Sequence, residues 1–254
     1  MTIAAHDVVV RFPNTAAPTL RNIDLSVPDG SFLVLVGASG SGRSTLLHCL
    51  AGLITPTGGT VVDDGETVTA PDPRRGVAFQ RDVLFPWMSV ADNIAFGRRA
   101  HGVPRRERPA RIAELLDLVG LSGEGGAQRP SRLSGGMRQR VGLARMLAGE
   151  PAIMLMDEPF AALDALTRLR MQDLLIDLWT RLNRTVVFVT HDIDEAIRLS
   201  DTIGVLRDGR IRTHLTNPLS RPRPAATLAD QPAYSALRRR LHHELGLEPC
   251  DPPS

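Results

Sequence analysis

Lysine is absent from this sequence of 254 residues, so all 30 of its Lys and Arg residues are arginine. Genomic base composition or deliberate redesign could each produce such a chain-wide absence. The net charge is only +2, which does not require a nucleic acid as partner. We therefore expect no nucleic-acid binding, and we interpret most of the charges as a solvated surface.

Cysteine and long apolar runs are also scarce. The only two cysteines are Cys49 and Cys250, which excludes a disulfide framework or a cysteine metal cluster and indicates a reducing compartment. No apolar run approaches the roughly 20 residues that span a bilayer. The first residues lack the charged and then apolar pattern of a secretory signal. We expect neither a membrane span nor a signal peptide.

The order of apolar segments predicts an α/β fold. At 43% hydrophobic content, the chain can form one large domain with a subdomain. The apolar run 32–36 predicts a buried strand, and the spacing in 43–51 predicts a helix that stops at Gly52. Two later segments with strand character, 152–157 and 185–192, flank a helical stretch around 165–182. This βαβ order predicts a parallel sheet.

Other segments have weaker patterns. Helical spacing between about Arg81 and Glu150 predicts a helical insertion, whose clearest apolar face is Ile112, Leu115, Leu116 and Val119. Farther on, Asp192 and Glu195 form a helix-capping pair, and Asp208-Gly209 predicts a hairpin. The proline-rich stretch after Asn217 predicts a surface linker. A last helix spaces Leu237, Leu241 and Leu245 four apart.

The stretch Val36–Thr45, VGASGSGRST, predicts a phosphate-binding loop. Gly37, Gly42 and Ser44 match the pattern Gly, four residues, Gly, Lys, then Ser or Thr, but Arg43 takes the place of lysine. Backbone N–H groups here can surround a phosphate, and a hydroxyl is suited to Mg²⁺. An ordinary tight turn is the alternative. The expected ATP-binding residues are Gly37, Ser39, Gly40, Ser41, Gly42, Arg43, Ser44 and Thr45, with Ser44 also a Mg²⁺ ligand.

Two adjacent carboxylates lie at the end of the expected strand 152–157. Asp157 at the strand tip can hold Mg²⁺ through water, and Glu158 can orient and deprotonate an attacking water. Alternatively, the two acids cap a helix. Because they follow a buried strand in a chain that also has the glycine loop, we favour phosphate chemistry.

The segment RLSGGMRQRVGLARML, which contains Ser134, Gly135 and Gly136, is the most specific signal. With the loop and the acids, it resembles the ATP-binding subunit of ABC transporters over about Val8 to Thr213. The resemblance implies an ABC ATPase fold of the P-loop NTPase class, with an N-terminal antiparallel β subdomain, a parallel-sheet core and a helical subdomain. The expected domains are a nucleotide-binding domain over 1–217, with the helical subdomain at about 81–150, and a linker and helical tail over 218–254.

The resemblance also implies a role for each matching residue. Ser134, Gly135 and Gly136 are similar to the signature that covers ATP bound by the opposite subunit. Gln80 resembles the Q-loop glutamine that senses Mg²⁺ and water, Asp164 the D-loop aspartate, and His191 the switch histidine at the γ-phosphate. Phe12 lies where the family places an aromatic against adenine; a core aromatic on a strand is the alternative. The implied catalytic set is Glu158, His191, Gln80 and Asp164, and the implied Mg²⁺ ligands are Ser44, Gln80 and Asp157.

Three further features resemble importers of the nitrate, sulfonate and taurine group: LFPWMSVADNIAFG after Gln80, Met137 in the signature, and DEPFAALDALTR. This implies a homodimer with two composite ATP sites, peripheral on the cytoplasmic face of the cell membrane. Its implied partners are permease subunits, which dock near Pro86 and Trp87, and indirectly a solute-binding protein. A subunit that binds nucleotide without hydrolysing it is the alternative. A repair or translation ATPase is disfavoured because the chain has neither long coiled coils nor tandem cassettes.

Arginine at position 43 bears on activity. Lysine is a compact point charge on a slim stem, whereas arginine is planar and wider, so the exchange is not conservative. Nucleotide binding should survive in weakened form, while hydrolysis should suffer more, because it depends on accurate charge placement. We attribute Arg43 to the chain-wide exclusion of lysine, since the other expected site residues are intact.

Overall fold

The structure is a computed structural model that describes all residues except 1, 14, 81–83, 101–107, 124–125 and 248–254. The expected start of the helical insertion at Arg81 and the second cysteine, Cys250, therefore lie outside the described residues. The chain divides into two compact units, one formed by 1–70 with 187–254 and the other by 71–186. The division falls within strand β8.

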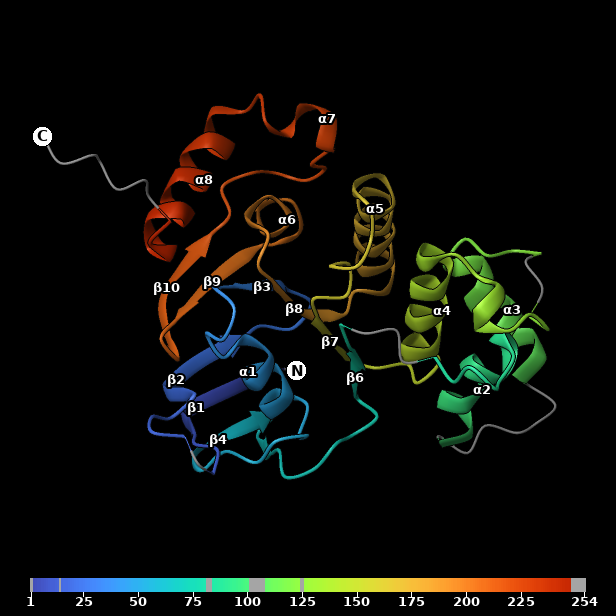
Figure 1. The fold of residues 1–254 in the computed structure, drawn as a ribbon, viewed down its shortest axis with the longest axis horizontal. Helices are drawn as coiled ribbons and strands as arrows, with labels where there is room; N and C mark the ends of the chain where they lie inside the picture. The colour runs from blue at the N-terminus through green and yellow to red at the C-terminus, as the bar shows by residue number, and fades with distance from the viewer. Residues whose placement is uncertain (1, 14, 81–83, 101–107, 124–125, 248–254) are drawn as a thin grey trace, which may run out of the picture. The chain divides into compact units, whose positions relative to one another are not determined.

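The first unit contains an antiparallel sheet near the N-terminus (Figure 1). Its order is β2-β1-β4-β5, and in β1 Ile3 lies opposite both Val27 and Asp63. Side chains of β2 alternate between buried and exposed, as expected when one face covers a core. The antiparallel subdomain is confirmed. The strands are β1 (Ile3–Val10), β2 (Leu20–Val27), β4 (Gly58–Asp63) and β5 (Glu66–Thr67).

The same unit contains strands in the order β10-β9-β3-β8, and β8 belongs to it from residue 187 onward. β3 pairs in parallel with β9, with Leu33 opposite Thr202, and every residue of β3 and β8 is buried. Continuous apolar strands are typical of parallel sheets covered on both faces. The strands are β3 (Phe32–Val36), β8 (Thr185–Thr190), β9 (Thr202–Arg207) and β10 (Arg210–Thr216).

The predicted turn and cap of the first unit are present. Asp208 and Gly209 both have positive φ, 53° and 72°, and join β9 to β10 as a hairpin. Asp192 caps α6 by accepting hydrogen bonds from the N–H groups of Asp194 and Glu195. The Glu195 carboxylate accepts from the Thr190 hydroxyl at 2.5 Å, and that hydroxyl oxygen accepts from the N–H of Asp192 at 3.0 Å.

Four helices belong to the first unit: α1 (Arg43–Leu50), α6 (Ile193–Leu199), α7 (Ala225–Leu228) and α8 (Pro232–Leu245). α8 packs against α6 and β9 (Figure 1). The segment between β10 and α7 was expected to cross the surface, but Asn217, Leu219 and Arg223 are buried there. Their side chains and backbone are tied to the end of α6, which the sequence pattern did not reveal.

The second unit pairs β6 and β7 in parallel and groups three helices beside them. α2, α3 and α4, which lie within the stretch expected to be helical, pack on one another (Figure 1). Leu115, Leu116 and Val119 of the expected apolar face are buried. The elements are β6 (Arg75–Ala78), α2 (Val90–Ala100), α3 (Arg108–Leu118), α4 (Gly135–Leu147), β7 (Ile153–Asp157) and α5 (Ala165–Leu182).

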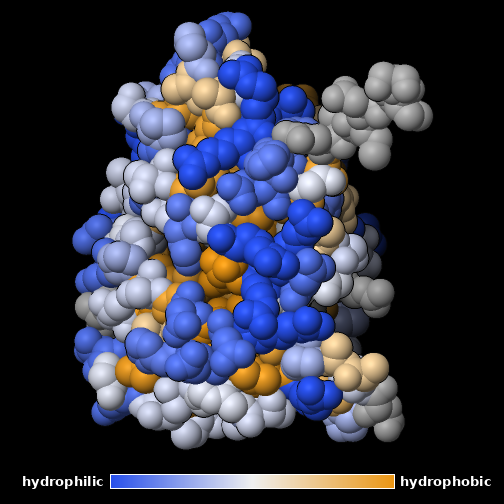
Figure 2. Space-filling view, turned by 90° about the vertical axis from the view of Figure 1, so that its left-hand side faces the viewer, coloured by the Kyte–Doolittle hydropathy of each residue, from blue (hydrophilic) through white to orange (hydrophobic). Residues whose placement is uncertain are grey.

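Among the helices over the described residues, none has the length and apolar character needed to cross a bilayer. The face of the molecule drawn in Figure 2 is mostly hydrophilic, and hydrophobic residues show between the polar ones. The large apolar side chains that are exposed include Trp87, Phe96, Leu166 and Leu169, all in the second unit.

Candidate nucleotide-binding site

The glycine loop joins β3 to α1 in the first unit. Gly42, the residue before α1, has φ 103°, and a Cβ there would lie 2.7 Å from the Leu20 side chain. A Cβ at Gly37 would lie 2.3 Å from the carbonyl oxygen of Leu206. Both positions therefore require glycine, because the backbone is left-handed at one and neighbouring atoms crowd both. The loop is thus a narrow turn of backbone directly before a helix.

The loop residues present groups suited to a phosphate. Gly42 offers no side chain to cap α1, so the first N–H groups of the helix lack an intrahelical partner. Ser41 Oγ is buried and makes no hydrogen bond within the part of the chain that the structure describes. The tip from Ala38 to Gly40 and Ser44 are exposed. An uncapped helix start beside an unsatisfied hydroxyl fits an anionic ligand such as a phosphate group.

Arg43 is the first residue of α1 and is 7% exposed. Its side chain is therefore largely removed from water. Arginine keeps the positive charge of the lysine in the usual pattern but needs a wider space and prefers two parallel contacts. The substitution thus changes the shape of the charged group inside a loop that tolerates little extra volume.

The end of β7, in the second unit, positions Asp157 and Glu158. Asp157 ends the strand and is 7% exposed. Glu158 adopts a left-handed backbone with φ 43°, which is costly for a residue with a side chain. Gln80 Nε2 donates to Glu158 Oε2 at 3.4 Å, so the structure brings these two predicted residues together. Neither acid caps a helix, since the cap of the following α5 is Asp164.

The signature residues begin α4. Ser134 caps the helix and accepts a hydrogen bond from the N–H of Met137 at 3.3 Å. A Cβ at Gly136 would lie 2.7 Å from the Thr167 side chain, so this glycine lets α4 approach the start of α5. The sequence did not indicate this packing role.

Asp164 caps α5 by accepting from the N–H of Thr167 at 2.9 Å. That backbone hydrogen bond holds the pKa of the Asp164 carboxyl below its ordinary value. Asp164 therefore has a structural role in the isolated chain, whatever it contacts in a dimer. Sequence reasoning assigned it only to the D-loop.

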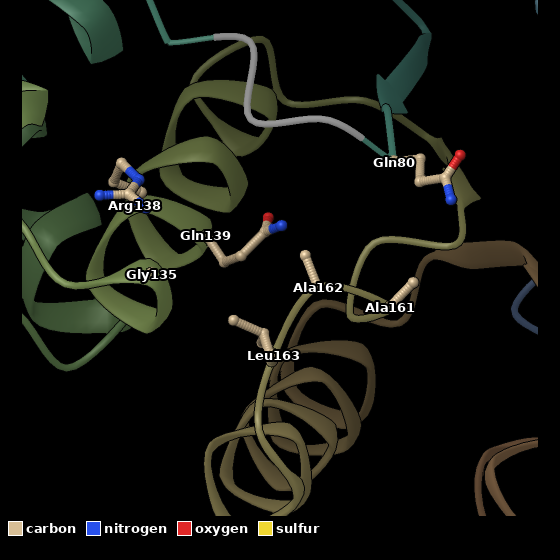
Figure 3. Close-up of a pocket in the computed structure, with 7 residues that line it drawn as sticks. All are labelled: Gln80, Gly135, Arg138, Gln139, Ala161, Ala162 and Leu163. Carbon is tan, nitrogen blue, oxygen red and sulfur yellow. The ribbon is translucent and has the colours of Figure 1, made fainter.

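A cavity of about 470 Å³ lies between the signature helix and the segment before α5 (Figure 3). Gln80 and Gly135 line it, as do Ala161 to Leu163, and Gln139 of α4 points toward Ala162. The sequence analysis missed Gln139. Its spacing of four residues from Gly135 places both on one face of α4, a signal that could have found it.

His191 and Phe12 belong to the first unit with the glycine loop. His191 follows β8 and is exposed. Phe12 lies beyond the end of β1 and is 38% exposed, so the alternative of a core aromatic is wrong for this residue. An exposed ring is available to stack on a base. Within the described residues, no group of three or more His, Cys, Asp and Glu side chains could hold a metal.

Comparison with known proteins gives the family. The family model described as ABC transporter matches residues 20–161, more than half of the chain. The chain belongs to the ABC transporter family. Among ABC relatives, the taurine import ATP-binding protein TauB of Pseudomonas syringae pv. tomato is 50% identical over 80% of this chain and 78% of its own. TauB of Mesorhizobium japonicum is 44% identical over 92% of this chain and 93% of its own.

Solved ABC structures agree with the fold. The dimeric ATP-binding cassette MJ0796, in a post-hydrolysis state bound to ADP and phosphate, has a TM-score of 0.75 and 32% identity. The match covers 86% of this chain and all of that one. A second dimeric structure of the same bacterial ABC transporter cassette also has a TM-score of 0.75. The ABC ATPase fold expected from the sequence is thereby confirmed.

Proposed function

We propose that the chain is the ATP-hydrolysing subunit of an ABC importer for a small sulfonate such as taurine, or for nitrate. It works as a homodimer on the cytoplasmic face of the cell membrane, beneath two permease subunits. A solute-binding protein delivers the solute to these permeases. The observation that carries the proposal is Glu158, a strained carboxylate at the tip of β7 within reach of Gln80. The names and dimeric state of the relatives support the importer type and the dimer.

Each copy would bind ATP through its glycine loop and Phe12. The N–H groups of Ser39 to Ser44 would hold the phosphates, with Phe12 against the adenine. Ser44, Asp157 and Gln80 would hold Mg²⁺, which when bound neutralises charge on the phosphate oxygens. Ser134, Gly135 and Gly136 of the second copy would cover the γ-phosphate.

Hydrolysis would use water as the nucleophile. Glu158 accepts a proton from that water as its oxygen bonds to the γ-phosphorus and the bond to the bridging oxygen of ADP breaks. Gln80 orients Glu158, and His191 contacts the γ-phosphate. ADP is the leaving group. Asp164 acts across the dimer interface from its place at the start of α5. The products are ADP and phosphate, and their release reopens the dimer.

An aromatic patch in the helical region supports a permease partner. Phe85, Trp87 and Phe96 form it, with ring centroids 5.4 Å apart for Phe85 and Trp87 and 4.8 Å for Phe85 and Phe96. Trp87 is 67% exposed, whereas Asn93 beneath the patch is fully buried and bonded to both backbone polar groups of Phe85. A rigid support under exposed aromatic rings suits protein docking.

Arg43 weakens hydrolysis in this proposal. The second candidate function, a subunit that binds nucleotide without turnover, rests on the same residue, buried in the loop where a lysine is usual. The test is Mg²⁺-dependent phosphate release by the natural chain, Arg43→Lys and Glu158→Gln, with ATP binding measured in each. Turnover of the natural chain above Glu158→Gln shows a working ATPase, and we expect Arg43→Lys to raise kcat by up to about 10²-fold. Binding without turnover in all three proteins contradicts the proposal.

A further inference from the structure

Helix α6 follows the switch histidine. It begins at Ile193, two residues after His191, and its cap Asp192 connects the two. The helix has only seven residues, fewer than an isolated helix needs to be stable in water. Its place, and with it the place of the chain at His191, must therefore be set by what packs around it. Both of its ends are held by residues from the C-terminal 40 or so positions, all within the first unit.

The C-terminal end of α6 is closed by buried side chains. Asn217 Nδ2 donates to the carbonyl oxygens of Ile197 at 2.7 Å and Ser200 at 3.1 Å. Arg223 donates to the carbonyls of Ile197 and Arg198 at 3.2 and 3.3 Å, and it is 5% exposed. These bonds satisfy carbonyl groups that every helix leaves without partners at its end. They anchor α6 where it leads into β9.

The N-terminal end of α6 is tied to α8. One oxygen of Asp194, in the first turn, accepts from the Tyr234 hydroxyl at 2.6 Å and from Arg238 Nε at 2.9 Å. Tyr234 and Arg238 are four residues apart and so share one face of α8. On the buried side of the same helix, Leu237 and Leu241 are 6% and 0% exposed. A packed helix thus presents a phenol and a guanidinium to a single carboxylate.

We propose that Tyr234 and Arg238 are positioning residues for His191, acting through Asp194 and α6. The inference rests on the proposed function, in which His191 contacts the γ-phosphate. A hydrogen-bonded charge pair at the first turn fixes the direction in which α6 leaves the switch segment. Small displacements of a group that contacts the reacting phosphate reduce rate more than they reduce binding.

The sequence offers a closely matched control. Arg239 and Arg240 follow Arg238 on α8 and are exposed like it, but neither makes an ion pair or side-chain hydrogen bond in the described structure. Arg239→Gln removes the same charge from the same helix turn as Arg238→Gln. Only Arg238→Gln removes the contact with Asp194.

The experiment is a double-mutant cycle on ATP hydrolysis by the full chain. Arg238→Gln, Asp194→Asn, their combination, Tyr234→Phe and Arg239→Gln are made in the Arg43→Lys background, and kcat and KM for ATP are measured well below the melting temperature. We expect Arg238→Gln and Asp194→Asn each to lower kcat by about 3- to 10-fold with KM within about twofold. The double variant should lose no more than the worse single one, and Arg239→Gln should match its parent.

Three results overturn the positioning role: unchanged kcat in both single variants, losses that multiply in the double variant, or an equal loss in Arg239→Gln. A rise in KM at constant kcat also contradicts it, because that pattern indicates weakened binding alone. Absence of turnover in every protein of the set, including the Arg43→Lys parent, contradicts the proposed function instead. If no protein of the set turns over, hydrogen exchange at residues 193–199 tests the positioning role separately. Faster exchange in Arg238→Gln than in Arg239→Gln supports it, and equal exchange overturns it.

The contact can be observed directly because Tyr234 is the only tyrosine of the sequence. Burial, and then the hydrogen bond to Asp194, raises the pKa of Tyr234 to about 12, against the opposing charge of Arg238 and with a small addition from Asp192. At a pH of about 10.5 an unperturbed tyrosine is mostly ionised. We expect little tyrosinate absorbance from the folded chain there and more from Asp194→Asn. Equal absorbance from the two proteins would show that the Asp194 contact is not made in solution.

Discussion

Gly42 is the loop residue at which backbone conformation and crowding act together. Its φ of 103° is unfavourable for any residue with a Cβ, and that Cβ would meet Leu20 at 2.7 Å. We expect Gly42→Ala to lower the free energy of unfolding by more than about 1 kcal/mol. We also expect weaker ATP binding, since the start of α1 must shift. Thermal or urea unfolding and equilibrium nucleotide binding measure the two effects.

Gly40→Ala is the matched control for that prediction. Gly40 also has positive φ, 79°, but a Cβ there meets no described atom within 4 Å. Alanine at this position therefore adds backbone strain without a clash, and the loss of stability should be smaller. Equal losses in the two variants would show that crowding at Gly42 contributes nothing.

Single residues show where sequence reasoning reached its limit. The spacing of loop glycines and the acids after an apolar run predicted Gly42, Asp157 and Glu158 as site residues. It could not predict the left-handed backbone of Glu158 or its bond with Gln80, because both depend on the tertiary path of segments far apart in sequence. Their roles in ATP binding and hydrolysis stay predictions until activity is measured.

Helices and strands were more predictable than the side-chain contacts that join one segment to another. The helical stretch expected around 165–182 coincides with α5, because it lies between two apolar strands in a βαβ order. The sequence could not show that the proline-rich segment after Asn217 is packed, since Asn217 and Arg223 are polar and are buried only because they meet the end of α6. Polar side chains that satisfy backbone groups look like surface residues in a sequence.

Helix α4 carries a glycine that its structure does not require. Gly142 lies inside the helix, and a Cβ there would meet no described atom within 4 Å. We expect Gly142→Ala to raise the free energy of unfolding by about 0.5–1 kcal/mol, because alanine loses less conformational entropy in a helix. Chemical denaturation of both proteins measures the change.

Gly136→Ala in the same helix should have the opposite effect, because its Cβ would lie 2.7 Å from Thr167. A stabilising Gly136→Ala would contradict the close packing of α4 against α5. A destabilising Gly142→Ala would indicate that the apparent open space at that position is filled in solution.

At the scale of the whole molecule, the exposed aromatic patch of Phe85, Trp87 and Phe96 predicts how the chain meets a membrane partner. We expect Trp87→Ala to reduce copurification with the permease subunits while leaving ATP hydrolysis by the isolated chain and its melting temperature unchanged. Leu53→Ala is the control, because Leu53 is another exposed apolar residue, 45% exposed, in the other unit. Equal recovery of permeases with Trp87→Ala and Leu53→Ala would contradict docking at this patch.

The two compact units differ in whether their residues are continuous in the sequence. Residues 71–186 are one continuous stretch, whereas the other unit unites the first 70 residues with positions from 187 onward. During synthesis on the ribosome, the continuous stretch can form the contacts within its own unit as soon as it emerges. The strand β3, by contrast, must wait for β9, because Leu33 pairs with Thr202, a residue 202 − 33 = 169 positions later. The glycine loop at the end of β3 therefore acquires its final support only after β9 has been made and can pair beside it.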